Sequence, residues 1–392
     1  MRVAARIRVA VAAGVLALPA RTLPGQVPGN RVEAPRIELV RELVIGADSV
    51  RPEYQFTAIG YVAATHSGSI FVTGGLSEPI RKYHRTGRYR GSIGRVGSGP
   101  GEYRLLEGMA VVADTLLVVF DWGNGRLVVF DTSGAYRRTF RAPSGTFSSP
   151  FQAFAAFGDG TVGVRVRTIG GWNGEGGTPS VFVRYRPDGT LVDSIRVPAE
   201  AVAGIATGSP LVGWRWAFPA TTVFALLPSG GVAVAQTTKY SIEVTPPAGR
   251  PFTIERETVR MPIEGGEREE WEAMARMAAS GPRPQTVSIP RHKPIIRGLF
   301  ADLDGRLWVD LYTRADHFEP TAPARPGRSP GLTWWEHNAY DVFDQRGAYL
   351  GRVDLPAWTR LVTVVGTRVW LAEQTEDGDR VLVRYEMRVA RP

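Results

Sequence analysis

The chain has 392 residues, a formal net charge of +9 and no cysteine. The lack of cysteine excludes disulfide bonds, thiolate metal sites, a cysteine nucleophile and a lipid-modified cysteine. Arginines are spread along the whole chain without a dense basic block, so nucleic-acid binding is not expected either.

The first 20 residues have the composition of an export signal. Arginines at positions 2, 6 and 8 precede an apolar run at residues 9–20, which is too short to span a bilayer. We therefore expect an exported protein, periplasmic or extracellular, without an integral membrane span. The cleavage site is not assigned, because Leu18 occupies a position that usually needs a small side chain. Residues 21–35 contain Pro and Gly and are interpreted as a spacer.

Residues 37–45 are the first predicted strand. Apolar side chains at positions 37, 39, 43 and 45 show the two-residue period of a β-strand. No hairpin partner follows directly, so this strand needs a partner from elsewhere in the chain.

The clearest repeating unit covers residues 109–140. It contains four short apolar runs separated by Asp, Asn, Gly and Ser, a pattern typical of a four-stranded antiparallel meander. Similar units recur at a period of roughly 45 residues, which predicts an all-β fold, a six-bladed β-propeller over residues 36–392. The turns of the first hairpins are predicted at Gly68, Asp114, Gly160, Gly230, Gly305 and Gly366, and those of the second hairpins at Gly87, Gly134, Gly189, Gly249 and Gly347.

The sixth unit ends after three strands, the last of which is expected at residues 380–387. The lone strand at residues 37–45 is expected to supply the fourth strand. Closure of this kind removes an exposed sheet edge, which a stable propeller requires.

The spacing between turns locates the insertions. The excess length falls between strands two and three of blades 3 and 5, and at the junctions from blade 3 to 4 and from blade 4 to 5. These two kinds of connection leave a meander at the same end, so we expect loop and helix insertions on one face, over blades 3 to 5. The insertion at about residues 257–295 is expected to hold a helix at residues 267–279, with Trp271 on its apolar side. The helix is interpreted as a cap, with a partner-binding helix as the alternative.

Blade 2 contains the segment Asp121-Trp-Gly-Asn-Gly-Arg-Leu-Val-Val-Phe-Asp131. It resembles the core of NHL-type repeats, which occur in six-bladed propellers. The preceding segment Gly97-Ser-Gly-Pro-Gly-Glu-Tyr103 resembles a junction common in bacterial propellers of that group. The resemblance is weaker at residues 302–309 and 340–347.

Asp121, Asn124 and Arg126 of this segment are interpreted as a turn lock. Asn tolerates a left-handed backbone and Arg pairs with Asp, so a structural role is favoured over ligand binding. The neighbouring glycine cluster lacks the Lys-Ser/Thr ending of a phosphate-binding loop, and we interpret it as a tight crossing between blades.

The candidate binding residues are aromatic. Exposed aromatic side chains around a polar centre serve in carbohydrate or peptide recognition, whereas buried ones anchor long loops, and both interpretations stay open. The tryptophans in or beside the insertions are Trp172, Trp214, Trp216, Trp334 and Trp335.

His317, Glu319, Glu336 and His337 flank the insertion of blade 5. They are weak candidates for a divalent metal site or for acid/base chemistry if they converge. No metal or other cofactor is assigned, and no catalytic residue is identified from spacing.

The leading functional hypothesis is a monomeric, non-catalytic binding or scaffold module. Its partner is expected to be a protein, peptide or glycan bound on the inserted face of blades 3 to 5. The alternative is a propeller hydrolase or lyase, similar to lactonase-like six-bladed propellers, with a metal in the central channel.

Overall fold

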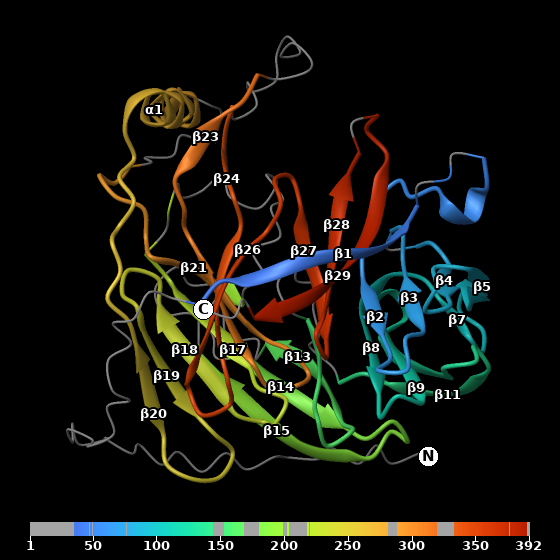
Figure 1. Cartoon of the computed structure of the whole chain (residues 1–392). Coiled ribbons are helices and arrows are strands. Elements are labelled where there is room, and N and C mark those ends of the chain that lie inside the picture. Colours follow the sequence, from blue (N-terminus) through green and yellow to red (C-terminus); the bar gives the residue numbers. More distant parts are fainter. Residues whose placement is uncertain are drawn as a thin grey trace.

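Strands with apolar residues at alternate positions form six antiparallel sheets in the computed structural model, and the sheets are arranged as a six-bladed propeller (Figure 1). The predicted all-β fold is therefore confirmed. The structure describes residues 35–46, 48, 50–75, 77–143, 153–167, 180–198, 202–203, 218, 220–280, 288–319, 333–375 and 377–389. The expected export signal and nearly all of the spacer lie outside these residues.

The first three blades each use four consecutive strands. Blade 1 consists of β2 (Val62–Ala64), β3 (Ile70–Val72), β4 (Ile80–Tyr83) and β5 (Tyr89–Ile93). Blade 2 consists of β8 (Leu106–Val112), β9 (Leu116–Asp121), β10 (Arg126–Asp131) and β11 (Tyr136–Arg141). Blade 3 consists of β12 (Phe154–Ala156), β13 (Val162–Arg167), β14 (Ser180–Tyr185) and β15 (Leu191–Val197).

The last three blades carry additions to this plan. Blade 4 consists of β17 (Thr222–Leu226), β18 (Val232–Gln236), β19 (Ser241–Thr245) and β20 (Phe252–Glu255), with the short β16 (Val202–Ala203) parallel to β17. Blade 5 consists of β21 (Ile296–Ala301), β22 (Leu307–Leu311), β25 (Ala339–Phe343) and β26 (Tyr349–Asp354). Blade 6 consists of β27 (Arg360–Val365), β28 (Arg368–Gln374), β29 (Arg380–Val389) and β1 (Ile37–Ile45).

Blade 6 joins the two ends of the described chain. β1 pairs antiparallel with β29, from Ile37 opposite Val389 to Ile45 opposite Leu382. Figure 1 shows blue β1 lying along red β29. The first and last strands thus share one sheet, and opening this sheet would expose unpaired backbone groups.

Smaller elements connect the blades. The helical ones are η1 (Pro52–Tyr54), η2 (Trp122–Asn124) and α1 (Gly265–Ser280). Two short sheets complete the structure: β6 (Arg95–Val96) with β7 (Glu102–Tyr103), and the hairpin of β23 (Ala315–His317) and β24 (Trp334–Glu336). The helix α1 lies in the insertion where the sequence predicts one. No helix among the described residues is long and apolar enough to cross a membrane.

The hydrophobic core is divided among the interfaces between blades. One cluster lies between each pair of neighbouring blades; the blade 6 and blade 1 cluster, for example, includes Trp370 and Tyr83. The inner strands also contact each other, as β2 does with β8 and β27, and β17 with β21. Each blade is therefore stable only against its neighbours, as expected for a repeat ring.

The two described insertions lie on one side of the ring. The helix α1 and the β23–β24 hairpin are both at the top of Figure 1, and we call this side the upper face. The opposite side, which carries the turns within the first and second hairpins, is called the lower face. Because the inner strand of each blade begins at the upper face, the first residues of β21 and β27 lie there beside the insertions.

Candidate functional site

An aromatic cluster lies on the upper face between blade 5 and blade 6. Trp335 of β24 packs on Trp358, with ring centroids 4.9 Å apart and planes inclined by 31°. Phe318 contacts Trp358 edge-on at 4.8 Å. Trp358 remains 47% exposed, so a large aromatic surface is held in place but left open to solvent.

The backbone of Trp358 is strained. Its φ angle is +62°, in the left-handed region that bulky residues rarely adopt. Such a conformation costs on the order of 1–2 kcal/mol and persists only where the surroundings impose it. The strain therefore accompanies the outward presentation of the indole ring.

A cavity of about 390 Å³ lies beside this cluster, and we call it the upper pocket. Its wall combines aromatic, charged and small residues from blades 5, 6 and 1: Ala58, Ile59, Trp335, Trp358, Thr359, Arg360, Ala372, Glu373, Gln374 and Arg380.

The upper pocket carries surplus positive charge. Arg360 donates through Nη2 to the carbonyl of Ile59 at 2.6 Å. Among the described residues, neither Arg360 nor Arg380 forms an ion pair. Burial lowers the pKa of Arg360, and the like charge of Arg380 acts in the same direction. The carboxylate of Glu373 accepts from Arg41 and from the Tyr385 hydroxyl, so its charge is directed elsewhere.

A second charged group lies under α1, and we call it the buried ion cluster: Glu267, Lys293, Arg297, Asp310 and Glu336. Lys293 is 1% exposed and bridges two carboxylates, with 2.8 Å from Nζ to Glu267 Oε1 and 3.1 Å to Glu336 Oε1. Arg297 continues the chain, at 2.5 Å from Glu336 Oε2. The cluster thereby ties α1 and β24 to the inner strand β21.

Arg297 owes its direction to a β-bulge. The register between β21 and β22 shifts between Ile296 and Gly298, so Arg297 leaves the ladder and turns toward the insertion. It donates to Asn338 Oδ1 at 2.9 Å and lies over the ring of Tyr312 at 4.9 Å. Although burial lowers the pKa of Arg297, the carboxylates of Asp310 and Glu336 raise it above its ordinary value overall.

Asp310 is the exceptional member of the buried ion cluster. It is 2% exposed, and within the described part of the chain neither carboxylate oxygen accepts a well-formed hydrogen bond. Arg297 Nη1 lies 3.6 Å from Oδ1. Burial raises the pKa of Asp310 to about 7, while Arg297 and the Leu311 amide oppose the rise and Glu336 adds to it. Burial therefore favours the protonated form of the Asp310 carboxyl.

The structure shows how α1 is anchored. Trp271 packs edge-on against Phe218 at 5.2 Å, and Glu270 accepts hydrogen bonds from the amide and hydroxyl of Thr333. These contacts fit the interpretation of α1 as a cap, because its apolar side is already occupied.

The tryptophans singled out in the sequence have different surroundings. Trp335 lines the upper pocket, whereas Trp334 packs against His317 at 5.3 Å and close to Gly266 of α1. Trp334 thus joins the hairpin to the helix. Trp172, Trp214 and Trp216 lie outside the described residues.

The four residues considered as weak metal candidates do not converge on one point. His337 Nε2 lies 2.9 Å from Asp316 Oδ2, and His317 faces Trp334. Glu336 belongs to the buried ion cluster. Glu319 is exposed. Within the described ranges, no group of three or more His, Asp and Glu side chains could hold a metal ion, so no step is assigned to a metal.

The predicted turn lock of blade 2 is visible in the structure. Asp121 is buried and accepts hydrogen bonds from Asn124 at 2.6 Å and Arg126 at 3.0 Å. Arg126 also donates to the carbonyls of Ser98, Gly99 and Glu102. The segment at residues 121–131 and the preceding segment at residues 97–103 therefore hold each other in a structural role.

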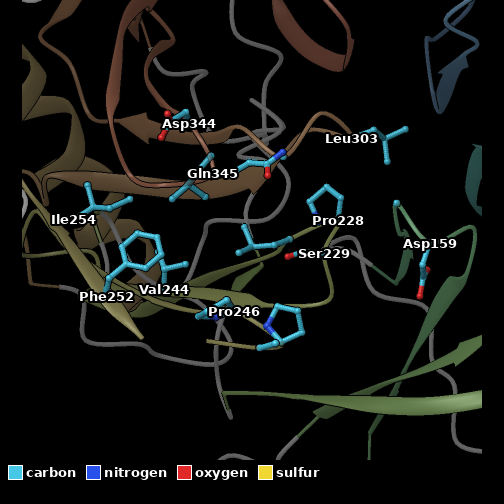
Figure 2. A pocket seen from close by; sticks show the side chains of 16 residues that line it. Asp159, Pro228, Ser229, Val244, Pro246, Phe252, Ile254, Leu303, Asp344 and Gln345 are labelled. Carbon is cyan, nitrogen blue, oxygen red and sulfur yellow. The ribbon is translucent and has the colours of Figure 1, made fainter. Parts of the chain in front are cut away.

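The lower face also has a cavity, of about 490 Å³, which we call the lower pocket. Figure 2 shows Val244, Phe252 and Ile254 along one side. Its polar residues serve local turns: Asp344 accepts from two backbone amides of its own turn, and Asp159 pairs with Arg184. The lower pocket is larger than the upper pocket, but its carboxylates Asp159 and Asp344 already have partners within the protein.

Several residues of the site were not identified from the sequence. Trp358 and Arg360 lie in a junction of ordinary length, so an argument based on insertions does not reach them. The one available signal was a tryptophan two residues before the arginine that begins an inner strand. Asp310 carried no signal, because its burial and its approach to Arg297 arise only in the folded chain.

No protein-family profile matches the chain, and a search of curated proteins gives no match. Among solved structures, a DUF4221 family member from Bacteroides vulgatus is similar, with a TM-score of 0.53 and 12% identity over 91% of this chain and 100% of that chain. A Bacteroides fragilis protein that is named as an exported protein gives a TM-score of 0.48. It is 11% identical, over 93% of this chain and 98% of that chain. At 12% identity the likeness to the Bacteroides vulgatus structure shows the fold alone.

Proposed function

We propose that this propeller is a non-catalytic binding module that takes its partner on the upper face, at the upper pocket. One observation carries the proposal: an exposed tryptophan on a strained backbone stands next to two arginines without ion-pair partners among the described residues. Aromatic and arginine side chains of this kind dominate binding energy at recognition sites. The proposal keeps the inserted face expected from the sequence, but centres on blades 5, 6 and 1.

The test uses the full chain and its Trp358→Gly variant on glycan and peptide arrays. Glycine removes the indole ring and accepts the left-handed backbone, so the fold should be kept. Binders retained by the wild type and lost by the variant support the proposal. If no binder is found, or if the variant retains every binder, the proposal is wrong.

A second candidate function rests on Asp310. A buried carboxyl whose pKa burial raises to about 7, with an arginine 3.6 Å away, has the properties of an acid/base group. This observation favours the hydrolase or lyase alternative. Hydrolysis of lactones by the purified protein, abolished in the Asp310→Asn variant, would support it. Unchanged turnover in that variant would exclude Asp310 from the reaction.

We also propose that the protein is exported and that its repeats are of NHL type. The charged and then apolar order of the N-terminus supports export, and the joined segments of blade 2 support the repeat assignment. Fractionation of cells that express the full chain tests whether the protein is exported. A full-length, uncleaved protein in the cytoplasm would contradict export.

A further inference from the structure

The charge of the upper pocket indicates the sign of its ligand. Arg360 and Arg380 both line the upper pocket, the charge of Arg380 lowers the pKa of Arg360, and within the described residues neither forms an ion pair. A guanidinium fork matches the two oxygens of a carboxylate, so an anionic group would remove the repulsion and gain directed hydrogen bonds.

The shape of the upper pocket indicates the body of the ligand. Trp335 and Trp358 present flat apolar surface, and the volume of about 390 Å³ is near the lower end of the ~300–1,000 Å³ typical of small-ligand sites. An extended peptide usually pairs with a free strand edge. β28, which supplies Glu373 and Gln374, is paired on both sides by β27 and β29. A compact ring therefore fits better than an added strand.

The remaining polar groups suit hydroxyls. Glu373 offers acceptor oxygens, each with capacity for a second hydrogen bond, and Gln374 has both an amide donor and an acceptor. Arg380 adds donors on the same wall. A hydroxyl group both donates and accepts, so it satisfies such a mixed wall.

We propose that the upper pocket binds a saccharide that carries a carboxylate. The sugar ring lies on the Trp335 and Trp358 surface, its carboxylate pairs with Arg360 and Arg380, and its hydroxyls bond to Glu373 and Gln374. This inference rests on the proposed function, and it names the chemical class of the ligand.

Calorimetric titration of the full chain tests the class with defined probes. The carboxylated probes are a short oligogalacturonate, an oligoalginate and sialyllactose. The comparators are the methyl-esterified oligogalacturonate and a glutamate-rich peptide of equal charge. At least one carboxylated saccharide should bind, with at least ~10-fold weaker binding of the ester and the peptide, and with affinity that falls as salt rises.

Two matched variants locate the interaction. Arg380→Gln removes one exposed positive charge at the upper pocket and should weaken binding of the carboxylated saccharide about 10-fold. Arg346→Gln makes the same change in an exposed turn on the lower face and should leave binding unchanged.

Each other outcome overturns the inference. Failure of all three carboxylated saccharides to bind, or an equal response of both variants, contradicts it. If the ester binds as well as the acid, the charge argument is wrong; if the peptide binds as well, the saccharide class is wrong. In these last two cases the proposed function survives, provided that Trp358→Gly still abolishes binding. The proposed function fails separately if the Trp358→Gly variant binds as well as the wild type does.

Discussion

The buried ion cluster and the upper pocket both gather charge on the upper face, but they use it differently. In the cluster, Lys293 and Arg297 are surrounded by carboxylates at 2.5–3.6 Å. In the pocket, Arg360 and Arg380 line the same wall without such partners among the described residues. The cluster joins three elements of the protein to one another, whereas the pocket leaves its charge available.

The contrast separates a structural use of charge from a recognition use. A buried cation that already has two carboxylates has little left to offer a ligand, and removing it leaves unpaired charge in the interior. Removing a cation that has no ion-pair partner costs little stability. The protein then loses the binding energy that this cation would contribute to a ligand. Tyr340 is paired with Asp310 across β22 and β25, and its raised pKa, caused first by burial, also responds to the charges of Asp310 and Arg360.

The largest effect is expected at Lys293. Replacing it with Met should lower the free energy of unfolding by ~3–5 kcal/mol, because Glu267 and Glu336 stay buried without their bridging cation. Chemical denaturation measures the loss. The exposed Lys239 is the control, and its change to Met should cost less than ~0.5 kcal/mol. Equal costs at the two positions would mean that the cluster does not stabilise the fold.

Asp310 should make stability depend on pH. Because its pKa rises on folding from 3.8 to about 7, the folded state holds a proton that the unfolded state releases. This contribution is fully present below pH 3.8 and is lost as pH rises through about 7. Relative to Asp310→Asn, the wild type should therefore lose up to about 4 kcal/mol between pH 4 and pH 8.

Denaturation curves of both proteins across this pH range measure the difference. Glu267, whose pKa is raised first by burial, is present in both and drops out of the comparison. A difference that stays constant with pH would show that Asp310 is ionised throughout.

At Trp358, the comparison of two small residues isolates backbone strain. Trp358→Gly should be about 1 kcal/mol more stable than Trp358→Ala, because only glycine adopts a φ of +62° without a steric cost. Both variants lose the same ring contacts with Trp335 and Phe318. Thermal unfolding measures the difference, and equal stability would mean that the strain is absent.

The smallest effect on stability is expected at Arg380. Arg380→Gln should change the free energy of unfolding by less than ~0.5 kcal/mol, with a slight gain because the like charge beside Arg360 is removed. A loss of more than ~1 kcal/mol in the same denaturation assay would place Arg380 in the structural group with Lys293.

The sequence by itself determined the blades and their turns. The two-residue apolar period and the turn glycines are local signals, so the hairpins of blade 2 and the position of α1 were predictable. Strand starts were less accurate: the first strand of blade 2 was expected at residues 111–112, and β8 begins at Leu106. There the register shift between Leu106 and Gly108 interrupts the alternation that identifies a strand.

Only the tertiary structure decided which side chains meet on the upper face. Trp335, Trp358 and Arg380 come from separate segments of blades 5 and 6, and Ile59 comes from the approach to blade 1. The first three meet because blades 5 and 6 are neighbours in the ring, whereas Ile59 joins them only because the ring closes, as the hydrogen bond from Arg360 to Ile59 shows. Likewise, the pKa of Asp310 depends on its burial and on the charges of Arg297 from β21 and Glu336 from β24. Contact and burial of this kind are not encoded in any local pattern, because they arise from packing between blades.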